Sequence, residues 1–340
     1  MPKDNENILF LDDEPLRPSE PLGFAYDQMV RCEECLRANP PTRLTCLYCA
    51  AALPRSESSS GFVIPNFRPI ESWEMGFNNI LRPDLSSEPT DQDLNKAASL
   101  LKLNADEISR VVATSSPMPL MRTATFAEAS EISRRLKGVG LETTIISDQD
   151  LGLKESPVRL RALSFDENGF TPRRISQSEA PKIPWSHLFL VLTGRLSTQR
   201  VELRERKQRR GENEIIETSE FFADDSVVDL YCRHPEVNFR IAANGFDFSC
   251  LSRMKLLAGE NFTLLLDELR RRAFEAAFDD SYDRYRPLLE VVWPAEQHTA
   301  SQGLRRERPG RYSIGAVTEN SNEAQFTRYS RLRYWLRSRS

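Results

Sequence analysis

Four cysteines in the first part of the sequence have the spacing of a metal site. Cys32 and Cys35 form one C-x2-C pair, and Cys46 and Cys49 form a second pair ten residues later. Two residues between paired cysteines let the chain turn tightly, so both sulfurs reach one ion at about 2.3 Å, and two such turns complete a tetrahedron. Four thiolates leave zinc no open position for water or substrate. The spacing therefore predicts one structural Zn²⁺ and no catalysis at this ion.

Two other kinds of chemistry could use the same cysteines. Iron bound by four sulfurs, as in rubredoxin, favours glycines in the turns and a longer separation between the two pairs. A redox dithiol would need one C-x2-C pair, whereas this sequence has two. We therefore expect zinc, with iron and a free dithiol as the alternatives.

Residues 30–54 resemble two groups of small domains, the short bacterial zinc ribbons and the zinc finger of the Ran-binding-protein type. Both share the pattern C-x2-C-x3-N-x6-C-x2-C, and Asn39 occupies the position of the asparagine. The resemblance implies an autonomous zinc ribbon, and we expect a bacterial protein.

The sequence departs from these families at residues that would contact a ligand. Val30 replaces the tryptophan of the finger type, and Leu36-Arg37 replace the Thr-Phe of its ubiquitin-binding members. The RNA-binding members have paired arginines and an aromatic residue in the loop, where this sequence has only Arg43. Arg43 is therefore the candidate contact residue on the ribbon. Bacterial ribbons have glycine after each pair, so Leu36 and Ala50 would cost about 1 kcal/mol if their backbones are left-handed.

No catalytic motif accompanies the cysteines. The sequence lacks the glycine-rich patterns of phosphate loops, dinucleotide-binding turns and hydrolase elbows. His234 and Glu236 have the H-x-E spacing of zinc deaminases, but no P-C-x-x-C follows them. We predict that the protein is not an enzyme. A site assembled without a sequence motif is the alternative.

Two basic segments could bind an anionic partner. The first lies between expected strands, where a solvated hairpin loop is the simplest interpretation, and its basic residues are Arg204, Arg206, Lys207, Arg209 and Arg210. The second is the carboxy-terminal segment QFTRYSRLRYWLRSRS, which mixes arginines with aromatic residues. Such a mixture could stack on single-stranded nucleic acid. Because it alternates as a strand does, we expect it to pair as an extra strand or to be disordered.

The composition indicates a globular protein with two or three compact units. The chain has 340 residues, of which 39% are hydrophobic and 28% charged, and its mean hydropathy is −0.50. The apolar run at residues 188–192 is far shorter than the ~20 residues that cross a bilayer. The first residues are acidic and lack the pattern of a signal peptide, so we expect a cytoplasmic location. A net charge of −4 disfavours nucleic-acid binding by the whole surface.

Changes in composition along the chain predict six segments of an α+β multidomain protein. The expected segments are a disordered acidic amino terminus at 1–28, a zinc ribbon at 29–54, a linker at 55–89, a small α/β unit at 90–150, a β-rich domain at 157–294 and an arginine-rich tail at 295–340.

The expected α/β unit shows two helix starts. Thr90 with Asp93, and Thr125 with Glu128, have the spacing of capping boxes, and apolar residues recur at helical intervals after each. Strand-forming residues flank the second helix. This order resembles the α/β carboxy-terminal domain of the ribosomal stalk protein and similar split βαβ modules.

The expected β-rich domain shows two hairpin signals and one helix. The pairs Asn168-Gly169 and Asn244-Gly245 each lie between apolar residues. About seven strands precede a helical stripe that Asn261 could cap. This layout resembles the pleckstrin-homology-like domains.

The most economical functional prediction is a zinc-binding, non-catalytic protein that binds a protein partner through its modules. Nucleic-acid association through the ribbon and the carboxy-terminal segment is the alternative, and it predicts binding that weakens steeply with salt.

Overall fold

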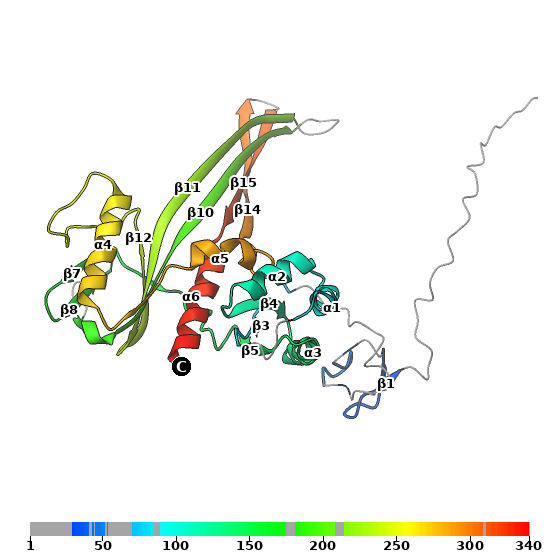
Figure 1. Ribbon diagram of the computed structural model, residues 1–340. Helices are drawn as coiled ribbons and strands as arrows, with labels where there is room; N and C mark the ends of the chain where they lie inside the picture. The colour runs from blue at the N-terminus through cyan, green and yellow to red at the C-terminus, as the bar shows by residue number, and fades with distance from the viewer. Residues whose placement is uncertain are drawn as a thin grey trace, which may run out of the picture. The chain divides into compact units, whose positions relative to one another are not determined.

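The computed structural model describes residues 29–40, 43, 45–51, 53, 70–84, 89–174, 181–207, 214–308 and 311–339, without the side chains of 206–207, 214–217, 303–308 and 311–314. The chain divides into two compact units, residues 1–67 and 68–340. The protein is of mixed α+β class, and the described residues contain six α-helices and several sheets (Figure 1). The expected acidic amino terminus at 1–28 lies outside the described residues.

The first unit is built around the cysteines. Two short strands, β1 (Val30–Arg31) and β2 (Ala38–Asn39), pair antiparallel and enclose the first C-x2-C turn. Cys32, Cys46 and Leu53 form its small buried cluster.

The second unit begins with a small sheet covered by helices. Its elements are β3 (Phe77–Leu81), α1 (Asp91–Leu101), α2 (Ala105–Ala113), β4 (Met118–Thr123), α3 (Phe126–Lys137) and β5 (Thr143–Ser147). The strand order is β4-β3-β5, with β3 antiparallel to both neighbours. The two capping boxes are confirmed, because Thr90 and Thr125 cap α1 and α3 and each bonds the residue three positions on.

The expectation that 55–89 is wholly linker is wrong, because β3 is the central strand of this sheet. Its sequence FNNIL hides the strand, since two of its four buried positions are asparagines. Both side chains are buried and donate to distant partners: Asn78 Nδ2 donates to Asp148 Oδ1 (2.8 Å), and Asn79 Nδ2 donates to the carbonyl of Ala129 (2.9 Å). Buried polar residues whose partners are distant in the sequence leave no apolar pattern to read.

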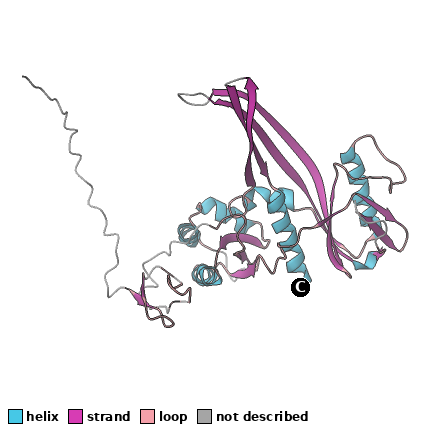
Figure 2. Ribbon diagram, turned by 180° about the vertical axis from the view of Figure 1, so that it is seen from behind, coloured by secondary structure: helices cyan, strands magenta, loops and turns pink. Residues whose placement is uncertain are grey.

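Two further sheets follow along the chain. A three-stranded sheet contains β7 (Ala162–Phe165), β8 (Gly169–Arg173) and β9 (Ile183–Pro184). A curled sheet has the order β14-β15-β10-β11-β12-β6, and β13 (Ala277–Asp279) pairs beside β10. Its strands are β6 (Val158–Arg159), β10 (Leu188–Lys207), β11 (Glu214–Arg233), β12 (Glu236–Ala242), β14 (Glu296–Arg308) and β15 (Arg311–Ser321). The outer halves of β10 and β11 extend with β14 and β15 as a long arm (Figure 2).

The two Asn-Gly signals have different outcomes. Asn168 lies in the turn between β7 and β8, so this hairpin is confirmed. Gly245 adopts a left-handed backbone with φ of 82°, but no strand returns alongside β12. Asp247 makes only an isolated bridge to Ala162. The second hairpin prediction is therefore wrong, although the turn is present.

Helix α4 (Ala258–Arg272) closes the larger hydrophobic core over β7, β8 and the inner half of the curled sheet. Phe262, Leu265 and Leu269 are buried there, as the helical stripe predicts. Asn261 is not the cap, because the helix begins three residues earlier. Its side chain instead accepts from the N–H of Lys255 (2.6 Å) and donates to its carbonyl (3.0 Å).

The expectation of a strand or disorder at the carboxy terminus is wrong. Helix α5 (Tyr282–Leu289) precedes β14 and β15, and residues 323–338 form helix α6 (Glu323–Ser338). Phe326, Tyr329 and Leu332 are fully buried, at a helical spacing that the alternating arginines obscure. The arginine-rich segment is therefore part of the core of the second unit. None of the helices in the described ranges is long and apolar enough to cross a membrane.

Candidate metal centre

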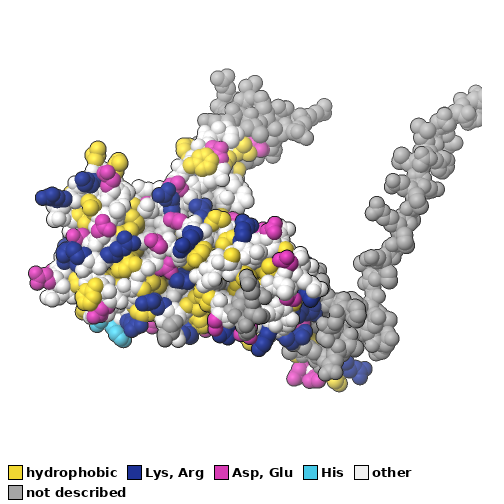
Figure 3. Space-filling model, viewed as in Figure 1, with side chains coloured by type: hydrophobic (Ala, Val, Ile, Leu, Met, Phe, Trp, Pro, Cys, Tyr) yellow, Lys and Arg dark blue, Asp and Glu magenta, His cyan; other side chains and the backbone are white. Residues whose placement is uncertain are grey.

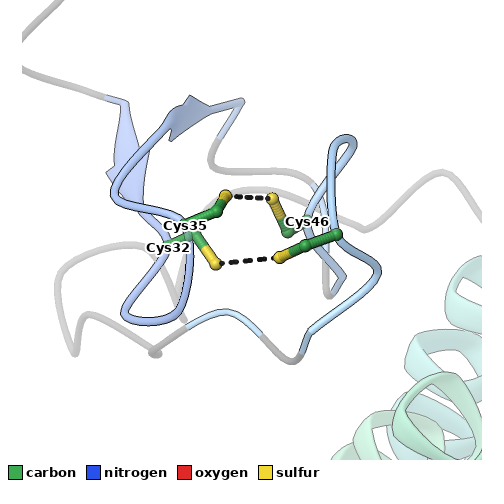
Figure 4. Close-up of side chains that lie close together, drawn as sticks. Cys32, Cys35 and Cys46 are labelled. Carbon is green, nitrogen blue, oxygen red and sulfur yellow. Dashed lines mark hydrogen bonds between the residues drawn. The ribbon is translucent and has the colours of Figure 1, made fainter.

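The four cysteine sulfurs face one another between two turns of the chain (Figure 4). Cys32 Sγ lies 3.6 Å from Cys49 Sγ, and Cys35 Sγ lies 3.4 Å from Cys46 Sγ. All four sulfurs lie within 4.8 Å of one another. The structure thus brings together the whole set of ligands that the spacing predicts.

These distances fit a metal ion better than disulfide bonds. All four cysteines are free, and their sulfurs are much farther apart than the ~2.05 Å of an S–S bond. A tetrahedron with Zn–S bonds of about 2.3 Å has sulfurs roughly 3.8 Å apart, close to the separations seen here. The donor set therefore fits zinc in a closed shell of four sulfurs.

The two turns that present the sulfurs have the same backbone hydrogen bonds. In the first, the N–H of Leu36 donates to the carbonyl of Cys32 (2.9 Å). In the second, the N–H of Ala50 donates to the carbonyl of Cys46 (3.0 Å). Leu36 and Ala50 both have φ of 58°, so both backbones are left-handed. This is the conformation that the sequence comparison raised for the positions after each cysteine pair. Each turn therefore contains a conformation that glycine would adopt with less strain.

Asn39 connects the two turns. It is fully buried at the end of β2, where its Oδ1 accepts the N–H of Leu47 (2.8 Å). Its Nδ2 donates to the carbonyl of Arg37 (2.9 Å) and lies 3.4 Å from Cys46 Sγ. One amide thus bonds the backbones of both turns and a ligand sulfur. This role explains why asparagine occupies the position between the two pairs.

The thiols differ in acidity because they share one small space. Desolvation raises the pKa of Cys46, but hydrogen bonds from the N–H groups of Tyr48 and Cys49 outweigh it and lower this pKa to about 6. The N–H of Ala51 lowers the pKa of Cys49, but desolvation and the other three thiols raise it to about 12. Without a cation, the cluster therefore retains protons that a divalent metal would displace.

The tips of the turns expose apolar side chains, of which the sequence patterns did not single out Leu47 and Tyr48. Leu36, Leu47 and Tyr48 have exposed fractions of 66%, 52% and 56%. The Arg37 guanidinium lies over the Tyr48 ring, 4.6 Å from its centroid. Arg43, the predicted contact residue, is exposed, and its Nε donates to the carbonyl of Thr45 (3.4 Å).

The basic residues of the 204–210 segment belong to the other unit. Arg204, Arg206 and Lys207 lie in β10, which pairs with β15 as far as Lys207, so this part of the expected solvated loop is strand. The side chain of Arg204 is exposed, and those of Arg206 and Lys207 lie outside the described side chains. Arg209 and Arg210 lie outside the described residues.

Comparison of the chain with protein-family models, with curated proteins and with solved structures finds no match.

Proposed function

We propose that residues 29–54 are a zinc ribbon whose metal is structural and whose exposed turn tips bind a protein partner. The observation that carries this proposal is the combination of a closed four-sulfur site with Leu36, Leu47 and Tyr48 exposed beside it. A closed shell supports folding rather than catalysis. Apolar side chains and an aromatic ring held on a rigid turn are typical anchors of protein interfaces.

A second exposed apolar feature supports protein binding. Phe221 and Phe222 are adjacent in β11, with exposed fractions of 54% and 73%. Neighbouring strand residues point to opposite faces, so each face of the arm exposes a phenylalanine side chain at this position. Figure 3 shows apolar side chains on the arm beside acidic ones. These residues extend the proposed non-catalytic, interaction role to the second unit.

We also propose that two parts of the second unit resemble known small folds. The order β3-α1-α2-β4-α3-β5 supports the likeness to split βαβ modules. Strands β6–β12 followed by α4 support the likeness to pleckstrin-homology-like domains, although the long arm is an addition to that layout. We also propose a cytoplasmic location, where reduced thiols would be available to zinc.

The contacts of α6 give nucleic-acid binding less support than protein binding. The rings of Phe326 and Tyr329 are buried and unavailable for stacking on bases. Arg328 and Arg333 are bound to Asp148 and Asp279 within the unit. The arginine-aromatic pattern is therefore accounted for by folding.

The metal is tested by elemental analysis of the purified protein. We expect one equivalent of zinc, lost in a Cys32→Ser, Cys46→Ser variant whose second unit still unfolds cooperatively. Iron in place of zinc, or reactive thiols without metal, would contradict the proposal.

The partner surface is tested separately with a Leu47→Ser, Tyr48→Ser variant that retains its zinc. We expect the proteins that co-purify quantitatively with the wild-type chain to be lost with this variant and retained with Glu34→Gln, a control at an exposed side chain of the first turn. Partners that survive the double substitution, or recovery of nucleic acid whose binding falls steeply with salt, would contradict a protein-binding ribbon.

A further inference from the structure

A polar cleft of about 800 Å³ opens in the second unit between three separate segments. It is lined by the loop after β5, by the end of β11 with the start of β12, and by the last two turns of α6. Its volume is within the range of small-molecule sites.

Unpartnered polar atoms are concentrated in this cleft. Among the described residues, six buried side-chain nitrogen or oxygen atoms have no hydrogen-bond partner, and four of them belong to residues lining the cleft. They are Asn238 Nδ2, Asn238 Oδ1, Arg331 Nε and Trp335 Nε1. Asn238 is only 6% exposed, so its whole amide is buried without a partner. Buried polar groups are normally paired, and such a concentration indicates a missing ligand.

Asn238 and Arg331 both lie beside Tyr231. Asn238 lies directly opposite Tyr231 in the β11–β12 ladder, so both side chains lie on the same face of the sheet. The Arg331 guanidinium lies over the Tyr231 ring, 5.8 Å from its centroid, and its Nη2 donates to the carbonyl of Glu155 (3.1 Å). Trp335 follows Arg331 by one helical turn and shares its face of α6.

The chemistry of the four atoms defines what would satisfy them. Three are donors and one, Asn238 Oδ1, is an acceptor. Two donors from Arg331 and Trp335 suit the two oxygens of a carboxylate. A side-chain amide with both atoms unpaired suits another amide, which presents a donor and an acceptor together.

The rim carries three carboxylates, from Asp150, Glu155 and Glu236, beside the guanidinium groups of Arg331 and Arg339. Asp150 accepts from Ser147 Oγ (2.6 Å), and Glu236 accepts from the Tyr334 hydroxyl (3.1 Å), so these two carboxylates have partners of their own. Arg339 lies over the Trp335 ring at 4.1 Å and adds a second positive charge. Burial raises the pKa of the Cys232 thiol to about 12, so this lining residue stays protonated and is no nucleophile.

We propose that this cleft binds the carboxylate end of a peptide-like acid, with the carboxylate on Arg331 and Trp335 and the adjacent amide on Asn238. The shared chemistry could come from the carboxy terminus of a protein or from a free acylated amino acid. Binding involves no covalent step.

The test uses the full-length zinc-loaded chain and two dipeptides that differ only at the end. N-acetyl-Ala-Ala with a free carboxylate is compared with the same dipeptide carrying a terminal amide, by following the indole N–H signals in nitrogen-15 spectra. The Trp335 signal is assigned with Trp335→Phe, which keeps an aromatic ring but removes the indole N–H. We expect saturable movement of that signal with the acid and at least tenfold weaker binding of the amide.

Variants separate the ligand site from the fold. Asn238→Leu removes both unpartnered atoms of the Asn238 amide and should abolish binding of the dipeptide acid, while the protein still unfolds cooperatively. Leu256→Ser, at a side chain that is 98% exposed and outside the cleft, should bind as wild type. A Trp335 signal that does not move with either dipeptide, as expected if water alone fills the cleft, overturns the proposal. Equal movement with both overturns it as well.

The two sources are distinguished with a longer peptide that ends in the same Ala-Ala carboxylate. Tighter binding of the longer peptide assigns the site to protein carboxy termini. Weaker binding of the longer peptide assigns it to a free acylated amino acid. Either result requires that the dipeptide acid binds.

Discussion

Arg328 of α6 donates from Nη1 to Asp148 Oδ1 at 3.2 Å, joining two residues that are 180 positions apart in the chain. Asp148 is fully buried at the end of β5 and also accepts from Arg122, whose Nη2 lies 2.7 Å away. The N–H of Gly76 donates to the same carboxylate (2.9 Å). One carboxylate therefore anchors the small sheet to the last helix of the chain.

Removing this carboxylate should destabilise the second unit strongly. Asp148→Ala leaves the buried Arg122 without its counter-charge, so we expect a loss of about 3–5 kcal/mol in the free energy of unfolding. Urea denaturation followed by circular dichroism measures this loss. Asp84→Ala is the control, because Asp84 is exposed and its removal should change stability by less than about 0.5 kcal/mol. Similar stabilities for the two variants would show that Asp148 is not an anchor.

At Gly194 in β10, side chains of α5 and α6 pack directly on the curled sheet. A Cβ atom there would lie 2.6 Å from ring carbons of both Phe326 and Tyr282. We expect Gly194→Ala to lower stability by about 1–3 kcal/mol because both buried rings must move. Gly259→Ala is the matched control. Gly259 lies in α4 with nothing near its Cβ position, so alanine should leave stability unchanged or raise it by up to about 1 kcal/mol.

Glycine in place of the left-handed residue after each cysteine pair should tighten zinc binding. Leu36→Gly and Ala50→Gly should each relieve about 1 kcal/mol of strain in the ribbon, equivalent to roughly fivefold tighter zinc binding. Competition with a chromophoric chelator measures the affinity. Leu47→Gly, at a tip residue for which no positive φ is found, should give no gain. Equal effects at all three positions would mean that backbone strain does not limit zinc affinity.

Asn39 should govern how long the ribbon retains its metal. Asn39→Ala removes the acceptor for the N–H of Leu47 and the donor to Cys46 Sγ, so the second turn loses its attachment to the first. Loss of such supporting contacts typically weakens metal binding by about 10–100-fold. We expect zinc transfer to a chelator to accelerate accordingly, while the second unit unfolds as in the wild type. An unchanged transfer rate would show that the cysteines alone hold the two turns together.

The acid stability of the second unit should depend on Asp279. Burial raises the pKa of Asp279, but the Ser281 hydroxyl and the Arg333 guanidinium outweigh it and lower the pKa below its ordinary value. A carboxylate with a lowered pKa stabilises the fold above its unfolded pKa of about 3.9, and this contribution is lost as the pH falls through the folded value.

We therefore expect Asp279→Asn to be less stable than wild type at pH 7, with a difference that shrinks below about pH 4. Denaturation at a series of pH values measures it. Asp280→Asn, the exposed neighbour, should follow the wild-type profile. A difference that is constant with pH would assign the effect to packing and not to the charge.

The cysteine cluster and two of the helix starts could be predicted from the sequence because the deciding contacts are local. Cys32 and Cys35 form one turn, Thr90 and Thr125 bond residues three positions away, and Asn168 makes a hairpin with its immediate neighbours. Such contacts depend on the order of a few residues, so residue type and spacing are sufficient. The α+β class followed from the same local patterns.

The central position of β3, the helical state of residues 323–338 and the cleft around Asn238 were decided only by the tertiary structure. Asn78 is tolerated in a core strand because Asp148 and Trp293 supply its partners, the latter from 215 residues away. The arginine-rich segment becomes a helix because the curled sheet buries Phe326 and Asp148 pairs with Arg328. Burial by distant elements outweighs local propensity here, since the free energy of packing a helix face exceeds the small differences between local preferences.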